Sequence, residues 1–422
     1  MRLSARLLAA CVLQFAGSGP QFSPPVLYGA IADSFGVEKA HVIATMPAAF
    51  AIGTFAFAVP GSLFMERFGL HRSFIFGGVG IALCAVAQAL CSSFAQLVLL
   101  HGMIGIFKAF LGDVAFVAFC TSWFHERTST AIGICFAAVG AGAMLWTLAA
   151  ARMASSFGWR AALAASAAVQ CLVSLPLAVC CMRDRPPGSL VRQPSRVARA
   201  SSHESGSTSG PWWLSDVSVW LLVLLGFSVV YTCYGVNNQM TLFIADEAHV
   251  SLSHASMYTS LIFLCNMLSK LASGHLYDST HGRQFAVGAC ATLVGGCLLL
   301  VHLSRAPTVG LEALAFAVVF GIGYGGSYSL IQSKAALHFG HRRGFKAVQG
   351  LLSAGQYAGM TLGYALPPEL THAFSYSFSF STLLCGALAS LVAIVAFEVR
   401  EASLSDTSSS SSSLKTPFLT GS

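Results

Sequence analysis

Three lysines of this chain lie inside long apolar segments, where a charged ammonium group is energetically unfavourable. Lys108, Lys270 and Lys334 each fall within a run of mainly apolar residues. A charged side chain at the centre of a bilayer costs roughly 2.5–3.5 kcal/mol on insertion scales. An anion beside the ammonium offsets part of this cost, so these lysines are candidates for binding a carboxylate or for pairing with an acid.

Lys270 belongs to a stripe of polar residues. Counted from Thr259, polar side chains recur after 7, 11, 14 and 18 residues, at Asn266, Lys270, Ser273 and Tyr277. This spacing defines one face of a helix, and a polar face with a charge is typical of a water-filled cavity. The alternative is that Lys270 snorkels to the lipid headgroups. It lies about 6 Å past the midpoint of its segment, which leaves about 9 Å to the edge of a ~30 Å core and favours the cavity.

Lys108 and Asp113 share another apolar segment. Lys108 lies near its midpoint, on a face with His101, Gly105 and Gly112. Two interpretations remain open for Lys108: contact with a substrate, or a structural polar bond. Asp113 is the only acid well inside a predicted span and is the candidate for carrying a coupled proton. Lys334 lies near the end of its segment and is predicted to snorkel or to belong to a gate.

Other polar residues within apolar segments are candidates for contact with a substrate. Interhelical hydrogen bonds, which contribute about 0.6 kcal/mol each on average, are the alternative explanation for them. The candidates besides Asn266, Lys270 and Lys108 are Gln21, Tyr28, Tyr231, Tyr234, Asn238, Tyr324 and Gln356.

The composition identifies the elements that must position these residues. Hydrophobic residues make up 55% of the chain and charged residues only 9%, whereas soluble domains carry about 25% charged residues. Since a membrane helix needs about 20 mainly apolar residues, the chain is predicted to be an all-α integral membrane protein. Its twelve expected spans are 6–31, 41–65, 72–93, 95–122, 128–151, 160–182, 216–244, 254–276, 284–303, 309–335, 346–367 and 375–398.

The loops between these spans indicate an orientation. With the N-terminus in the cytosol, sixteen Lys and Arg residues fall in inside segments and four in outside segments, so we expect both termini to be cytosolic. The spans group into an N-terminal six-helix bundle over 1–182 and a C-terminal one over 216–400. A Ser- and Arg-rich linker over 183–215 is expected to be cytosolic, and a Ser-rich tail over 401–422 to be disordered.

The two halves resemble each other in sequence. "GSLFMERFGLHR" follows the second span and "GHLYDSTHGR" follows the eighth; each places an acid, a glycine and an arginine in the same order. "GIFK", which ends at Lys108, aligns with "GIGY", which ends at Tyr324, and Gly133 and Gly142 match Gly350 and Gly359. Two parallel six-helix repeats with a hydrophilic linker resemble the major facilitator architecture. The resemblance implies a conformational lock at the acid–arginine loops, with Glu66, Arg67, Arg72, Arg127, Asp278, Arg283 and Arg342 as its members.

Finer motifs are similar to those of the monocarboxylate transporter and oxalate:formate antiporter group. They are "SWFHERTSTAIGI" between spans 4 and 5, "FGWRAAL" at span 6, and "GIGYGGSYSL" and "HFGHRRGFKAVQGLLSAG" across spans 10 and 11. In that group, span 8 carries an acid and, four residues later, a base that binds the substrate carboxylate. These positions fall on Asn266 and Lys270. Asn266 cannot carry a proton, so any coupled proton must use another residue.

The sequence therefore predicts a secondary active or facilitative transporter of small organic anions, with monocarboxylates as the leading class. Two alternatives stay open: a carrier of amino acids or other small polar metabolites with the same fold, and a membrane receptor or sensor that does not transport. No catalytic constellation, metal site or cofactor is expected. The expected partners are the substrate anion, the lipid bilayer and a co-transported proton, without nucleic acid. We expect the protein in the plasma membrane rather than in an organelle.

Overall fold

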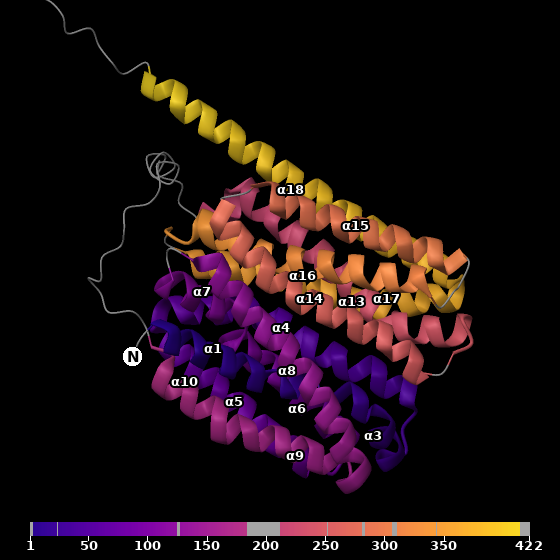
Figure 1. The fold of residues 1–422 in the computed structure, drawn as a ribbon. Helices are drawn as coiled ribbons and strands as arrows, with labels where there is room; N and C mark the ends of the chain where they lie inside the picture. The colour runs from indigo at the N-terminus through magenta and orange to yellow at the C-terminus, as the bar shows by residue number, and fades with distance from the viewer. Residues whose placement is uncertain are drawn as a thin grey trace, which may run out of the picture.

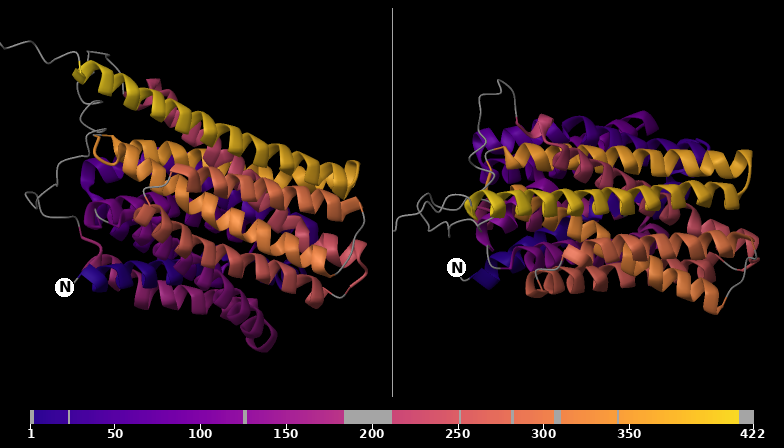
Figure 2. Two further views of the ribbon diagram at one scale, coloured as in Figure 1. Left: turned by 45° about the horizontal axis from the view of Figure 1, so that its top comes forward. Right: turned by 90° about the horizontal axis from the view of Figure 1, so that it is seen from above.

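The structure is a computed structural model, and it describes residues 3–22, 24–124, 127–183, 212–250, 252–280, 283–305, 310–342 and 344–413. The regular secondary structure of these residues is helical throughout. Figure 1 shows two helical bundles side by side, the N-terminal one in indigo to magenta and the C-terminal one in orange to yellow. In the two views of Figure 2 the long helices run roughly along one common direction, as expected for helices that cross a membrane together.

The described N-terminal bundle contains three continuous spans and three interrupted ones. Its elements are α1 (Leu3–Gly17), α2 (Gly19–Phe22), the 3₁₀ turn η1 (Pro24–Leu27), α3 (Tyr28–Phe35), α4 (Lys39–Phe68), α5 (Leu70–Leu90), α6 (Phe94–Leu111), α7 (Asp113–Trp123), α8 (Thr128–Phe157), α9 (Trp159–Val169), the π-helical turn η2 (Gln170–Ser174) and α10 (Leu175–Cys181).

The C-terminal bundle is built mainly from long continuous helices. A short helix, α12 (Trp212–Ser215), precedes α13 (Val217–Glu247), α14 (Leu252–Thr280), α15 (Arg283–Arg305), α16 (Leu311–Phe339), α17 (Phe345–Ala373) and α18 (Tyr376–Ser413). α18 extends beyond residue 400, where we expected the bundle to end and a disordered tail to begin. Most of the predicted linker, residues 184–211, and the last part of the tail, residues 414–422, lie outside the described residues.

The predicted twelve-span architecture agrees with these helices. Within the described part of the chain, nine helices are long and apolar enough to cross a membrane. The remaining crossings are made by the interrupted segment α1–α3, by α14 and by α17, which carry more polar residues or breaks. The expectation of an all-α membrane protein with two six-helix bundles is confirmed.

The fourth span differs from its prediction as one helix over 95–122. Gly112 separates α6 from α7 with a nearly extended backbone, φ −82° and ψ −151°. Its N–H donates a hydrogen bond to the carbonyl of Lys108 at 2.6 Å. A Cβ at this position would lie 2.6 Å from the same carbonyl oxygen, so glycine fits this turn better than a residue with a side chain. The break places Asp113 in the first turn of α7.

The two bundles meet along two pairs of helices. α4 packs against α17 and α8 packs against α14; we call these contacts the seams. We call the end of the molecule at which α10 ends and α12 begins the linker end. The start of α1 and the end of α18 lie at this same end in Figure 1.

Candidate functional site

A cavity lies between the two bundles, and we call it the central cavity. Its volume is about 60 Å³. Both halves of the chain supply its walls, which combine aromatic rings, amides and three charged groups. The lining residues are Gln21, Lys108, Asp113, Phe136, Val139, Gly140, Ala143, Val230, Tyr234, Phe263, Asn266, Lys270, Tyr324, Tyr328, Gln356, Tyr357 and Met360.

Most of the side chains proposed from the sequence meet in this cavity. They are Lys270, Asn266, Lys108, Tyr324, Gln21, Tyr234 and Gln356, together with the proton candidate Asp113. They come from several helices of both bundles, and Asn266 and Lys270 share α14. The helical spacing that suggested each polar face therefore leads to one shared space.

Three of the proposed contacts lie elsewhere. Tyr28 packs in a small separate core with Leu27 and Ile31. The hydroxyl of Tyr231 lies 3.2 Å from that of Thr382. The amide of Asn238 donates to the backbone carbonyl of Tyr364 at 3.2 Å. These three are hydrogen-bonding or packing residues rather than cavity residues, since a shared helix face can point at several neighbours at once.

Lys270 is held above two aromatic rings of α16. Its side chain is buried, and its Nζ lies 5.1 Å from the ring centre of Tyr328 and 5.7 Å from that of Tyr324. Ring faces attract a cation at such distances. α14 and α16 pack closely here, and Ser269 of α14 donates a hydrogen bond to the carbonyl of Ile322 of α16 at 2.7 Å. The ammonium thus lines the cavity, in agreement with the cavity interpretation and not with snorkelling.

Asp113 lies opposite, on the other bundle, where the fourth span is broken. Its Oδ2 accepts a hydrogen bond from the hydroxyl of Tyr328 at 2.6 Å, and this bond joins the two bundles at the cavity. Its carboxylate also interacts electrostatically with both Lys108 and Lys270. Broken helices at the midplane are typical of substrate sites in membrane carriers.

Two buried amides in the cavity wall have donors without a partner. The Nδ2 of Asn266 and the Nε2 of Gln356 form no hydrogen bond with any described residue, although both side chains are nearly inaccessible. The other end of the Gln356 amide accepts from the Nε2 of Gln332 at 3.0 Å. Buried donors without partners are unfavourable, so a bound group with acceptor oxygens would stabilise this wall.

Tyr328 lines the cavity although it is not among the residues predicted from the sequence. Tyr328 follows Tyr324 by four residues, so both hydroxyl-bearing rings lie on one face of α16, and this spacing was a usable signal. Tyr357 also lines the cavity, with its ring 6.4 Å from that of Phe50 in an edge-on arrangement across the α4–α17 seam. The apolar wall formed by Phe136, Phe263 and Met360 had no polar signature in the sequence.

Two of the predicted lock residues, Glu66 and Asp278, form hydrogen bonds between the bundles at the linker end. Asp278 accepts hydrogen bonds from the backbone N–H of Ser129 at 3.2 Å and of Thr130 at 2.7 Å, in the first turn of α8 on the other bundle. The Thr130 hydroxyl adds a third bond at 2.7 Å. Glu66 accepts from the N–H of Gly344 at 2.9 Å, directly before α17. Each acid therefore caps a helix N-terminus of the opposite bundle, where unpaired N–H groups and the helix dipole favour a negative charge.

The arginines of the predicted lock have other positions. Among the described side chains, neither Glu66 nor Asp278 forms an ion pair with an arginine within 4.0 Å. Arg342 pairs instead with Asp216 at 3.4 Å, and Arg67 lies over the ring of Phe68. Arg72 and Arg127 are exposed, and the side chain of Arg283 lies outside what the structure describes. Among the described side chains, the two acids therefore cap helices and do not pair with arginines.

Matched glycines let the bundles approach at both seams. A Cβ at Gly133 of α8 would lie 2.5 Å from the carbonyl oxygen of Lys270 on α14. At Gly350 of α17 it would collide with Ser62 of α4. These are the two glycines that the internal repeat aligns, so the repeat preserves the close packing of both seams.

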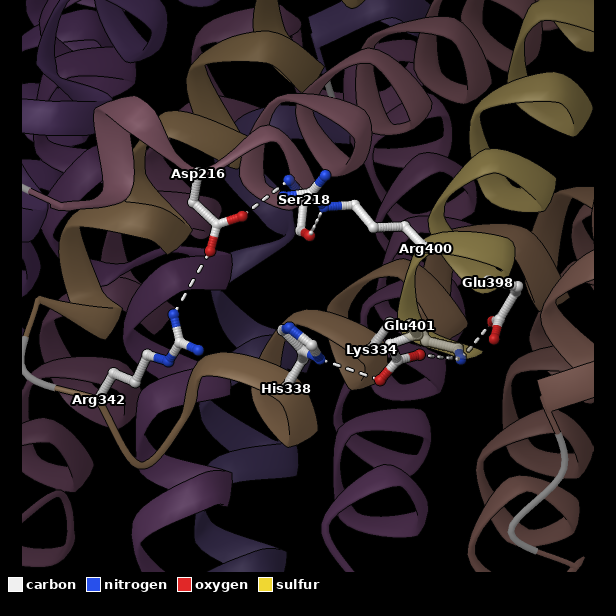
Figure 3. Close-up of polar contacts among 8 residues, drawn as sticks. All are labelled: Asp216, Ser218, Lys334, His338, Arg342, Glu398, Arg400 and Glu401. Carbon is white, nitrogen blue, oxygen red and sulfur yellow. Dashed lines mark hydrogen bonds and ion pairs between the residues drawn. The ribbon is translucent and has the colours of Figure 1, made fainter. Parts of the chain in front are cut away.

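Lys334 has a structural role within the C-terminal bundle. Figure 3 shows its ammonium between Glu398 and Glu401 of α18, and His338 Nδ1 lies 3.0 Å from the Glu401 carboxylate. Lys334 is 4% exposed, so the expectation that it snorkels is wrong. Nearby in the figure, Asp216 contacts Arg342, and Arg400 donates to the Ser218 hydroxyl. These contacts tie α16, α18 and the start of α13 together, away from the central cavity.

Comparison with known proteins identifies the family. The model of the Major Facilitator Superfamily matches residues 7–345 and 222–421. A comparison with curated proteins finds no match.

Solved structures of this superfamily share the fold. The proton:xylose symporter XylE is 14% identical and superimposes with a TM-score of 0.74, covering 92% of this chain and 94% of that one. The human organic anion transporter MFSD10 (TETRAN) is 16% identical with a TM-score of 0.70, covering 93% and 98%. The E. coli fucose:proton symporter FucP is 13% identical with a TM-score of 0.71, covering 94% and 99%. The chain belongs to the Major Facilitator Superfamily, and it is a multi-pass membrane transporter rather than an enzyme.

Proposed function

We propose that this transporter carries small organic anions, with monocarboxylates as the leading class. The observation that supports this most strongly is the buried ammonium of Lys270 in the cavity wall, beside the unpaired amide of Asn266. Lys108 adds a second cation and Asp113 one carboxylate. One positive charge is then unmatched in a space with little water, and a singly charged anion would match it.

The size of the central cavity favours a small solute. A volume of about 60 Å³ has room for about four to six water molecules at ~10–15 Å³ each. A carboxylate with two or three carbons fits such a space better than a hexose does. The aromatic rings of Phe136, Tyr328 and Tyr357 would contact the apolar end of the solute while the lysines and amides contact its carboxylate.

Binding would bias the conformational equilibrium through this charge. An empty cavity leaves the lysines partly uncompensated, whereas an occupied one is nearly neutral, so the two states differ in electrostatic free energy. Rearrangement of the bundles would require the Asp113–Tyr328 bond to break, together with the caps that Glu66 and Asp278 form. Asp113 is our candidate for a coupled proton, because it is the acid of the described cavity wall.

The orientation of the carrier is part of the same proposal. Basic residues concentrate in the loops of the linker end, which supports placing this end and both termini in the cytosol. The closed side of the structure would then be the cytosolic side. Residence in the plasma membrane rather than in an organelle remains our expectation.

Amino acids are the second candidate class. Lys270 and Asp113 lie in one cavity, so their charges complement the carboxylate and the ammonium group of a zwitterion. Lys108 distinguishes the two candidates, because its additional charge is compensated by a monoanion and is left uncompensated by a zwitterion. Sugars are a further class to test, because XylE is a xylose symporter and FucP a fucose symporter.

A ligand-stabilisation screen separates these classes. The purified carrier is heated with monocarboxylates, dicarboxylates, amino acids, xylose or fucose, and the shift of its melting temperature reports binding to the folded state. We expect the largest shift with a monocarboxylate. A shift confined to amino acids or to sugars would contradict the leading proposal.

The role of Lys270 is tested by uptake in proteoliposomes. Lys270→Gln is expected to abolish uptake of the stabilising anion, because the substitution removes the positive charge. Glutamine can still form hydrogen bonds, so the variant tests the charge alone. Lys270→Arg is expected to retain part of the uptake, because it keeps the charge. Both variants are compared at equal amounts of reconstituted protein, and normal uptake by Lys270→Gln would overturn the carboxylate-anchor proposal.

A further inference from the structure

Three buried glutamines of the C-terminal bundle have amide atoms without partners. Gln332 of α16, and Gln349 and Gln356 of α17, are each at most 3% exposed. Within the described part of the chain, the atoms without a hydrogen-bond partner are Gln332 Oε1, Gln356 Nε2 and both polar atoms of Gln349. Buried polar groups in folded proteins are nearly always hydrogen-bonded, to protein, to water or to a ligand. Four unpaired atoms on three glutamines therefore indicate that something polar occupies the space beside them.

The glutamines continue one wall of the central cavity. Gln349, Ser353, Gln356 and Met360 lie on one face of α17, because they are spaced by 4, 7 and 11 residues. Gln356 and Met360 line the cavity, and Gln332 is bonded to Gln356. Gln349 lies two turns from Gln356, about 10 Å further along the helix axis. Since α17 begins at Phe345, this direction leads to the linker end.

Gln349 also lies beside a seam that must open. Its neighbour Gly350 packs tightly against Ser62 of α4, and the Glu66 cap lies at the start of the same helix. Both contacts close the linker end in this structure. A solute that leaves the cavity toward the linker end must separate α4 from α17, and it then passes the unpaired amides.

We propose that Gln332, Gln349 and Gln356 form a second binding station for the transported anion, between the central cavity and the linker end. The inference rests on the proposed function as an anion carrier. Gln356 donates to the carboxylate where the anion leaves the cavity, and the amide N–H of Gln349, about 10 Å further along α17, donates to it next. The amide oxygens of Gln332 and Gln349 accept from accompanying water. The station has neutral donors, so it holds the anion more weakly than the lysines do. A weaker second site favours release, as in other permeation pathways with several sites.

The test replaces the unpaired amide of Gln349 by an apolar group of similar size. Gln349→Met is reconstituted and assayed with whichever of formate, acetate, lactate and pyruvate gives the largest melting-temperature shift with the unmodified carrier. We expect the uptake rate to fall about threefold to tenfold, the effect of one lost hydrogen bond. The ligand-induced melting-temperature shift should stay unchanged, because the central cavity is intact. Gln349→Leu, which also removes the amide and leaves the cavity residues unchanged, gives the same readouts if Gln349→Met does not fold.

A buried glutamine of the N-terminal bundle, Gln170, provides a matched control. Gln170 is 1% exposed, as Gln349 is, but its Nε2 donates to the carbonyl of Ala16 at 2.6 Å. Gln170→Met should lower the melting temperature without changing uptake per folded carrier. Unchanged uptake by Gln349→Met, with an equal or higher melting temperature, would show that the amides hold only water and would overturn the station. A failure of the proposed function is distinct, since none of the four anions would then stabilise the unmodified protein.

Discussion

The fourth and tenth spans occupy matching places in the two halves of the molecule, yet they differ in form and in chemistry. The fourth is broken at Gly112 into α6 and α7 and carries Lys108 and Asp113. The tenth, α16, is continuous, and Tyr324 and Tyr328 stand at the positions that the repeat aligns with Lys108 and Gly112. The fourth span thus supplies two charged groups and a break, whereas the tenth span supplies aromatic rings and hydroxyl groups.

The contacts that join the bundles at the linker end are similar in the two halves, whereas the residues that line the central cavity are not. Glu66 and Asp278 cap helices of the opposite bundle, and Gly133 and Gly350 permit close packing at the two seams. Two bundles that move against each other can use the same contacts on both sides. A small solute has no such symmetry, so its binding residues can diverge between the halves. The internal repeat thus retains the residues that join the bundles, whereas the residues that line the cavity differ between the two halves.

The largest effect should come from making the fourth span resemble the tenth. In Gly112→Ala the new Cβ would lie 2.6 Å from the Lys108 carbonyl oxygen, so the turn between α6 and α7 must shift. Such overpacking typically costs about 1–3 kcal/mol, and we expect uptake to fall at least about tenfold because Lys108 and Asp113 move with the turn. Gly288→Ala is the control, since nothing lies within 4 Å of a Cβ there. Equal uptake by both variants would show that the break is not needed.

A somewhat smaller effect should follow from removing only the carboxylate charge of Asp113 in the fourth span. Asp113→Asn keeps an oxygen that accepts from Tyr328 but cannot carry a proton. We expect uptake under an inward proton gradient to fall by roughly tenfold, which corresponds to about 1.4 kcal/mol, and to lose its dependence on that gradient. Asp33→Asn, at an exposed position of α3, makes the same exchange outside the cavity. If the response to the gradient is unchanged in Asp113→Asn, Asp113 is not the coupling residue.

The smallest effect should distinguish the two tyrosines of the tenth span. Tyr328→Phe removes the hydrogen bond to Asp113, and we expect uptake to fall about fivefold because a net hydrogen bond contributes about 1 kcal/mol. Tyr324 pairs with Tyr234 inside its own bundle, so Tyr324→Phe should change uptake by about twofold or less. Initial rates at several anion concentrations measure both. A reversed order would mean that the bond between the bundles contributes less than the bond within one.

Much of the fold could be predicted because hydropathy and the internal repeat depend on local composition. The break at Gly112 could not, since the surrounding residues are apolar and helix-forming on average, and the turn depends on contacts made after folding. Hydropathy detects length and polarity, and a single extended residue changes neither.

The site was predicted in part for a similar reason. Spacing placed Lys270 and Asn266 on one helix face, and the face indeed lines the cavity. Spacing could not say which neighbour each face meets, and the structure places Tyr28, Tyr231 and Asn238 outside the cavity lining. For Lys334, the partners Glu398 and Glu401 lie more than sixty residues away in sequence, and only the folded bundle brings them together.

The helices that line the pathway are also the ones least suited to entering a membrane. The interrupted first span, α14 and α17 do not qualify as apolar crossings within the described chain, and all three contribute polar residues to the cavity wall. Strongly apolar helices follow or flank each of them: α4, then α13 and α15, then α16 and α18. During synthesis, these polar segments are expected to depend on apolar neighbours for partitioning into the bilayer. The polarity needed for transport is therefore a burden on biogenesis, and the order of the helices along the chain helps to relieve it.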